Sequence, residues 1–123
     1  MGSLTGLLSE RFRREHADAL SRIVEWRVAE DADRETYEAH RTAVDRFDYL
    51  DRLYEATTPT LVVHGTADAV CPVTAAETLA EGLPRGEFHT VEGARHLVGV
   101  EASAAVNDVV AGWLAEQATD PDA

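Results

Sequence analysis

Two ionisable side chains in this sequence, Asp68 and His96, could together carry out acid–base chemistry. Asp68 closes the segment 59–68 and His96 closes the segment 88–96, each after a short apolar run and a loop that contains glycine. A carboxylate that accepts a hydrogen bond from the Nδ1–H of a histidine fixes the ring tautomer and stabilises the imidazolium. The Nε2 atom can then take a proton from a nucleophile or a water. The pair therefore predicts the acid and the base of a Ser-His-Asp type of site.

A nucleophile for this pair is not found in the sequence. No strand-turn-helix carrying Gly-x-Ser-x-Gly precedes the pair, and the segment 2–6 has the wrong spacing with no strand before it. The serines of the chain, none of them in a comparable turn, are Ser3, Ser9, Ser21 and Ser103. Cys71 is interpreted as a small buried hydrophobic residue and not as a nucleophile. Because it is the single cysteine, no intrachain disulfide is possible.

The elements that position the pair are expected to form a parallel βαβα unit. They are two strands and two helices in alternation, at residues 60–64, 73–82, 87–91 and 102–117. The continuous apolar run Leu61–Val63 is typical of a strand buried on both faces. Parallel strands of this kind are joined by a right-handed crossover, and functional groups lie beyond their carboxyl ends. We therefore expect Asp68 and His96 at one edge of the sheet, within hydrogen-bond reach of each other.

The residues before 58 are expected to be helical. Ser9 can cap a helix that runs to about Asp31, and Asp33 can cap a second helix. The second helix carries one apolar stripe at three- and four-residue steps, made of Tyr37, His40, Val44 and Phe47. On such a stripe His40 is interpreted as a core histidine and not as a catalyst. A short helical turn follows at about residues 50–54.

Composition excludes several classes of partner. The chain has 123 residues, a net charge of -12 and a pI near 4.6, so it lacks the cations that nucleic acid or an anionic membrane would require. Every basic residue is arginine, which together with the acidic excess predicts adaptation to a high-salt cytoplasm; a preference for arginine codons is the alternative. The sequence shows neither a signal peptide nor an apolar stretch that could span a bilayer, so a cytoplasmic location is expected.

Residues 58–117 resemble the C-terminal part of an α/β-hydrolase of the lid-bearing esterase, lactonase and epoxide-hydrolase type. The late-strand pattern of that family is a proline, an apolar run, His-Gly, two residues and an aspartate, with a further proline four positions on. It matches Pro59 through Asp68 and Pro72. The last-strand pattern of glycine, two residues, histidine, and glutamate five positions later matches Gly93, His96 and Glu101.

The resemblance extends to other segments and has two departures. The pairs Val106-Asn107 and Trp113-Leu114 match the final helix, and residues 9–55 resemble the end of the helical lid less specifically. Arg95 stands where the family usually has a small residue, and Ser103 stands where it usually has proline. The match covers nearly the whole chain but only the second half of the family's fold.

The resemblance implies hydrolysis of an ester, lactone or related carbon–heteroatom bond. His96 would be the general base and then the general acid, and Asp68 would orient it. No cofactor and no metal are expected. A metal site built from His89, Glu92 and His96 is rejected, because four-residue spacing needs a helix to converge and Gly93 lies inside the segment.

The implied organisation is a flexible leader at 1–8, lid-like helices at 9–57, the C-terminal βαβα part of a hydrolase core at 58–118 and a tail at 119–123. The family's nucleophile and oxyanion-hole amides precede the lid, so we expect the chain to be inactive alone. It is then half of a split hydrolase complemented by an N-terminal half, or part of a longer single-chain enzyme. The alternative is a non-catalytic remnant that serves as a self-associating or binding module.

Overall fold

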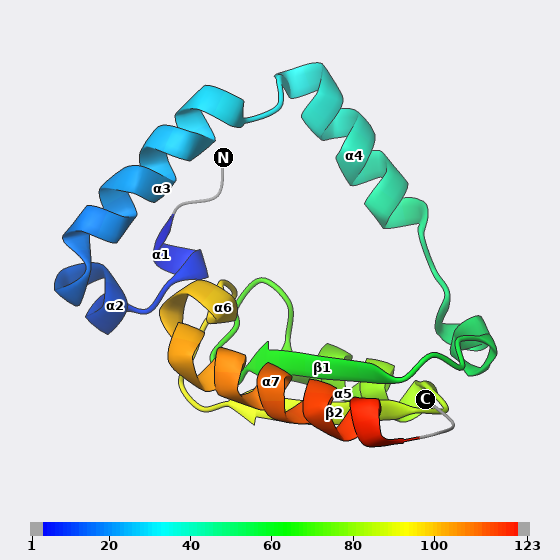
Figure 1. Cartoon of the computed structure of the whole chain (residues 1–123). Helices are drawn as coiled ribbons and strands as arrows, with labels where there is room; N and C mark the ends of the chain where they lie inside the picture. Colours follow the sequence, from blue (N-terminus) through cyan, green and yellow to red (C-terminus); the bar gives the residue numbers. More distant parts are fainter. Residues whose placement is uncertain (1–3, 121–123) are drawn as a thin grey trace.

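A pair of parallel strands lies at the centre of the computed structural model, which describes residues 4–120 (Figure 1). Strand β1 (Thr60–Gly65) pairs with β2 (Gly86–Val91), with the first residues opposite each other and the last residues opposite each other. Helix α5 (Val73–Gly82) connects the two strands and begins and ends at the expected residues. The predicted parallel unit is therefore confirmed.

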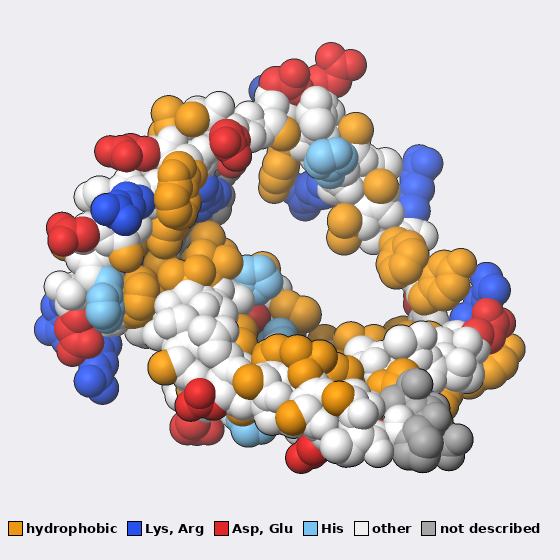
Figure 2. Space-filling view, viewed as in Figure 1, with side chains coloured by type: hydrophobic (Ala, Val, Ile, Leu, Met, Phe, Trp, Pro, Cys, Tyr) orange, Lys and Arg blue, Asp and Glu red, His pale blue; other side chains and the backbone are white. Residues whose placement is uncertain are grey.

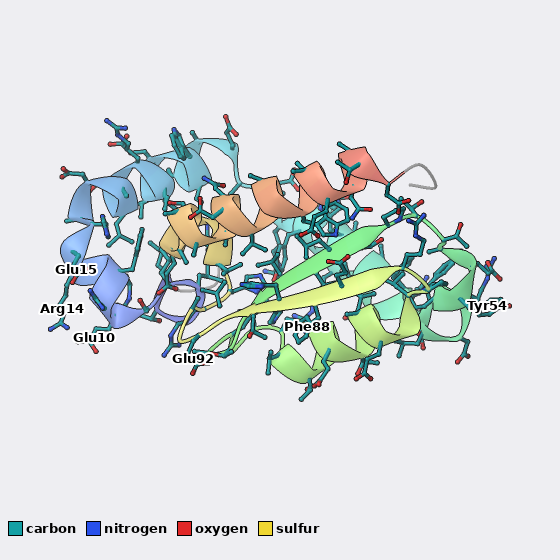
Figure 3. All side chains as sticks on the ribbon, turned by 60° about the horizontal axis from the view of Figure 1, so that its bottom comes forward. Glu10, Arg14, Glu15, Tyr54, Phe88 and Glu92 are labelled. Carbon is teal, nitrogen blue, oxygen red and sulfur yellow. The ribbon has the colours of Figure 1, made fainter. Side chains whose placement is uncertain are left out.

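Helices cover both faces of the strand pair. Helix α5 packs on one face, and α7 (Ser103–Thr119) lies along the other, so that the strands lie between two helical layers (Figures 1 and 3). A short helix, α6 (Val98–Glu101), leads into α7. Burial is nevertheless incomplete: residues 60–64 of β1 are only half-buried, although a strand buried on both faces was expected. The reason is that β1 has β2 on one edge and no strand on the other among residues 4–120.

The N-terminal part is helical, as expected, but is divided differently. Its helices are α1 (Leu4–Leu7), α2 (Glu10–Glu15), α3 (Ala17–Glu30), α4 (Arg34–Arg46) and the 3-10 helix η1 (Leu50–Glu55). Both expected caps are present: the Ser9 side chain accepts from the Phe12 amide at 3.2 Å, and Asp33 accepts from the Thr36 amide at 2.8 Å. The prediction of a single helix from Ser9 to Asp31 is wrong, because the backbone leaves the helical region at His16, with φ −128° and ψ 52°.

The segments expected to be a leader and a tail include helical residues. Residues 4–7 are helical, and Leu8 is fully buried. The Leu97 amide donates to the carbonyl of Leu7 at 2.9 Å, which ties this end of the chain to the loop that carries His96. At the other end α7 continues to Thr119, and Asp120 accepts from Arg85 at 3.0 Å. Residues 1–3 and 121–123 lie outside the described residues.

Helices α3 and α4 rise away from the strands and border an open hollow (Figures 1 and 2). The expected apolar stripe on α4 is present, but it is not packed: Tyr37 is 56% exposed and Val44 is 71% exposed. His40 is also exposed, so its interpretation as a core histidine is wrong. Figure 2 shows hydrophobic side chains along the sides of both helices that border the hollow. Large exposed apolar patches mark interaction surfaces or ligand-binding grooves.

No helix in the described part of the chain has the length and apolar character needed to cross a membrane.

The loops that follow β1 and β2 touch each other because Gly65 has no side chain. A Cβ atom at this position would collide with the backbone carbonyl of Ala94 and would lie 2.8 Å from the carbonyl oxygen of Arg95. In the native chain the Ala67 amide donates to the Ala94 carbonyl oxygen at 3.0 Å, across the same contact. The close approach of the two loops therefore requires glycine at this position.

Gly65→Ala should lower the free energy of unfolding by about 1–3 kcal/mol, the usual cost of forcing an extra methyl group into a packed site. The matched control is Gly112→Ala in the middle of α7, where nothing lies within 4 Å of an added Cβ. There alanine should stabilise by about 0.5–1 kcal/mol through helix propensity. Urea unfolding followed by circular dichroism measures both. A Gly65→Ala chain as stable as the wild type would contradict the packing described for these loops.

Candidate active site

Asp68 lies in the turn after β1, where its carboxylate is held by the backbone. Oδ1 accepts from the Val70 amide at 2.8 Å and from the Cys71 amide at 2.9 Å. Aspartate side chains commonly stabilise turns in this way, by accepting from amides two or three residues ahead. The side chain is only 2% exposed. One carboxylate oxygen is thus used to fix the turn, and Oδ2 is left to face a second partner.

His96 lies in the loop after β2 and is that second partner. Its Nδ1 atom lies 2.9 Å from Oδ2 of Asp68. A carboxylate only accepts, so Nδ1 carries the hydrogen, and Nε2 has the free lone pair when the ring is neutral. The His96 side chain is 38% exposed, which leaves one side of the ring accessible. The contact expected from the sequence is therefore present.

The loop of His96 is shaped by its neighbours. Gly93 adopts a φ of +74°, in the left-handed region that favours glycine. One residue before the histidine, the Arg95 amide donates to Oε1 of Glu101 at 3.0 Å. The same oxygen accepts from the Ser9 amide at 3.3 Å. Glu101, which the sequence singled out only by its spacing, thus links the N-terminal helices to the loop that carries the histidine.

Hydrogen bonds join the two loops directly. The Thr66 amide donates to the carbonyl of Val91 at 3.1 Å, and the Thr66 hydroxyl accepts from the Gly93 amide at 2.8 Å. Together with the contact between Ala67 and Ala94, these bonds hold the carboxyl ends of β1 and β2 in a fixed relation. The positions of the aspartate and the histidine therefore follow from the backbone of both loops and not from their own contact alone.

The surroundings of Asp68 favour its charged form. Partial burial of the carboxyl would by itself raise the pKa of Asp68. Hydrogen bonds from the Cys71 amide, His96 and the Val70 amide, together with the charge of His96, outweigh that effect, so the pKa of Asp68 lies below its ordinary value of 3.8. The aspartate is therefore ionised at neutral pH, as an acceptor for a histidine must be.

The structure also places the residues that the sequence analysis set aside. Ser9 caps α2 and Ser21 donates to a backbone carbonyl within α3, while Ser103 is the first residue of α7; Ser3 lies outside the described residues. Cys71 is half-buried. Within residues 4–120 there is no group of three or more His, Cys, Asp or Glu side chains that could hold a metal ion. His89 and Glu92 therefore belong to no such group.

A second histidine lies close to the pair. The Nε2 atom of His64 lies 3.2 Å from Oδ2 of Asp68 and 2.8 Å from the carbonyl oxygen of Cys71. The available signal was its place directly before Gly65, four residues ahead of the aspartate. Spacing alone does not show this contact, because the strand must end and the turn must close before the side chains meet.

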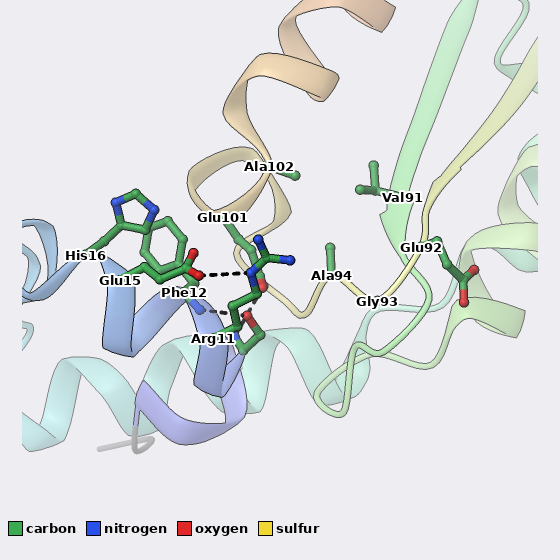
Figure 4. A pocket seen from close by; sticks show the side chains of 11 residues that line it. Arg11, Phe12, Glu15, His16, Val91, Glu92, Gly93, Ala94, Glu101 and Ala102 are labelled. Carbon is green, nitrogen blue, oxygen red and sulfur yellow. Dashed lines mark hydrogen bonds and ion pairs between the residues drawn. The ribbon is translucent and has the colours of Figure 1, made fainter.

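A cavity of about 450 Å³ lies beside this region but does not include the pair. It opens between α2 and the loop after β2, with the stacked rings of Phe12 and His16 on one side and Gly93 and Ala94 on the other (Figure 4). Neither Asp68 nor His96 lines it. The cavity is therefore separate from the pair.

Comparisons with known proteins identify the family and the fold. The model of the TAP-like protein family, an α/β-hydrolase family, matches residues 24–123. Among solved structures, Est816, described as an N-acyl homoserine lactone degrading enzyme, superposes with a TM-score of 0.75 at 28% sequence identity. The match covers 89% of this chain and 44% of that chain, so this chain spans less than half the length of that protein. None of the curated protein sequences gives a significant match. With four-fifths of its length inside the family match and with the strand pair and helices of that fold, the chain belongs to the TAP-like family of the α/β-hydrolase superfamily.

Proposed function

We propose that this chain provides the acid–base half of a hydrolase site, with Asp68 as the orienting acid and His96 as the general base. The observation that carries the proposal is the 2.9 Å contact between Nδ1 and Oδ2, formed between two loops of a hydrolase fold. The superposed lactone-degrading enzyme supports ester or lactone bonds as the class of substrate.

The chemistry of the pair follows from its hydrogen bond. With Nδ1–H directed to Asp68, the Nε2 atom of His96 takes a proton from a nucleophile that attacks the carbonyl carbon. The ionised aspartate stabilises the imidazolium that forms, and His96 then returns the proton to the leaving oxygen. An aspartate whose pKa lies below 3.8 remains an acceptor through both steps. The carbonyl oxygen of the intermediate also needs hydrogen-bond donors.

The nucleophile and those donors are proposed to come from an N-terminal hydrolase half. Two features of the described residues support this. The free edge of β1 offers unpaired backbone groups that a further parallel strand can use. The apolar side chains of α3 and α4 offer a second contact surface. Its exposed members are Val24 and Val28 on α3, Tyr37 and Val44 on α4, and Phe47 directly after α4.

A non-catalytic role is the second candidate, and the same surface favours it. A chain that buries its apolar helices and its β1 edge against a copy of itself would be a self-associating module without a reaction. The two candidates differ in whether His96 is needed for an activity, which the next experiment measures.

Purified alone, the chain should hydrolyse activated esters and lactones only at trace level. Mixed with an N-terminal hydrolase half that carries Gly-x-Ser-x-Gly, it should gain turnover. That turnover should fall by about 10⁶-fold in His96→Ala, as expected when the histidine of a triad is removed. The matched control is His89→Ala, since this exposed histidine on β2 lies outside the pair. Strong turnover by the chain alone that is lost in Ser103→Ala would overturn the proposal.

The depressed pKa of Asp68 predicts a pH-dependent stability. Its folded-state pKa lies below the ordinary value of 3.8, so the unfolded chain binds the proton first as the pH falls. The contribution of Asp68 to the free energy of unfolding is therefore complete well above 3.8 and is lost as the pH falls through the folded-state value. The stability difference between wild type and Asp68→Asn should shrink between about pH 6 and about pH 3.

Urea unfolding of both chains across this range measures the difference directly. The comparison with the asparagine variant removes the contributions of Asp33 and Glu55, exposed carboxyls whose pKa values are also lowered by their own hydrogen bonds, to Thr36 and Arg52 respectively. A difference that stays constant with pH would show that the environment of Asp68 does not favour its charged form.

A further inference from the structure

His64 occupies a position that the acid–base pair alone does not explain. It is the last residue but one of β1, and its side chain is only 15% exposed. Its Nε2 atom lies 2.8 Å from the carbonyl oxygen of Cys71 and 3.2 Å from Oδ2 of Asp68. A polar ring with so little exposure contacts the protein and not bulk water. Its hydrogen bonds are therefore electrostatically stronger than they would be in water.

The contact with Cys71 fixes where the hydrogen of His64 lies. A carbonyl oxygen only accepts, so Nε2 must carry the hydrogen and donate it. That N–H edge, which bears partial positive charge, also lies against the negatively charged Oδ2 of Asp68. His64 therefore acts on the aspartate in two ways, through the backbone of Cys71 and through the nearby carboxylate oxygen.

Cys71 is the link between the two residues. Its carbonyl accepts from His64, and its amide donates to Oδ1 of Asp68 at 2.9 Å. The turn at residues 65–71 is thus closed from both sides, by the strand residue that precedes it and by the aspartate inside it. If the histidine contact were lost, the Cys71 amide would be less firmly placed, and with it the orientation of the carboxylate toward His96.

We propose that His64 is a positioning residue: its Nε2–H holds the Cys71 carbonyl and thereby keeps Oδ2 of Asp68 directed at Nδ1 of His96. The proposal rests on the function proposed above for Asp68 and His96. Three substitutions separate the donor from the bulk of the ring. In His64→Gln the amide nitrogen occupies about the place of Nε2, in His64→Asn the amide is one carbon too short, and His64→Leu has no donor.

The test is the hydrogen exchange rate of the His96 Nδ1 proton, measured by NMR in the full chain labelled with ¹⁵N-histidine. A proton held in the pair exchanges slowly with water, so its rate reports on how well the carboxylate is placed. Exchange should become about three- to tenfold faster in the Asn and Leu variants, as expected from the loss of one ordinary hydrogen bond. It should stay near the wild-type rate in the Gln variant. His89→Gln, on the exposed side of β2, is the control and should change nothing.

The outcomes separate this proposal from the one on which it rests. A protected proton in the wild type, with equal rates in all three variants, would overturn the role of His64 and leave the acid–base pair intact. A wild-type chain with no protected His96 Nδ1 proton would overturn both proposals. If the Leu variant does not fold, the Gln and Asn variants still decide, because they differ only in whether the amide reaches Cys71.

Discussion

The arrangement of the two loops depends on the hydrogen bonds that the Asp68 carboxylate accepts. One of its oxygens closes the turn after β1 by accepting from two backbone amides, and the other accepts from His96, which belongs to the loop after β2. The two loops reach each other because Gly65 allows the backbone at Ala94 to come close. A buried charge is costly unless it is paired and hydrogen-bonded, and this carboxylate accepts from three donors and lies against the His64 ring. The site is therefore formed by the backbone of the strand pair.

The rest of the chain is organised around that edge of the sheet. Helices α5 and α7 cover the strand pair, and Glu101 and Leu97 connect the N-terminal helices to the loop of His96. The outer edge of β1 and the apolar sides of α3 and α4 remain uncovered in the described part. Together with a match to 44% of a lactone-degrading enzyme, this arrangement supports the proposal that Asp68 and His96 are an acid and a base. It also supports the proposal that the nucleophile comes from a further hydrolase segment.

The sequence predicted the strand pair, helix α5 and the contact between Asp68 and His96, because apolar runs that end at Gly or Pro leave little freedom in where elements begin and end. It did not predict the break at His16 or the burial of Leu8, since both depend on how the N-terminal helices meet the distant loop after β2. The periodicity of α4 identified an apolar face correctly. Periodicity does not identify what covers such a face, and for this reason the interpretation of His40 was wrong.

The central claim, that Asp68 fixes His96 as a general base, is tested most directly by the tautomer of the neutral His96 ring. Long-range ¹H–¹⁵N correlation spectra of the labelled chain distinguish a protonated ring nitrogen from one with a free lone pair. A carboxylate bound at Nδ1 sets the proton on that nitrogen, so the spectra should show Nδ1 protonated and Nε2 unprotonated. A ring that carries its proton on Nε2 would contradict the account, because that nitrogen would then have no lone pair to accept a proton.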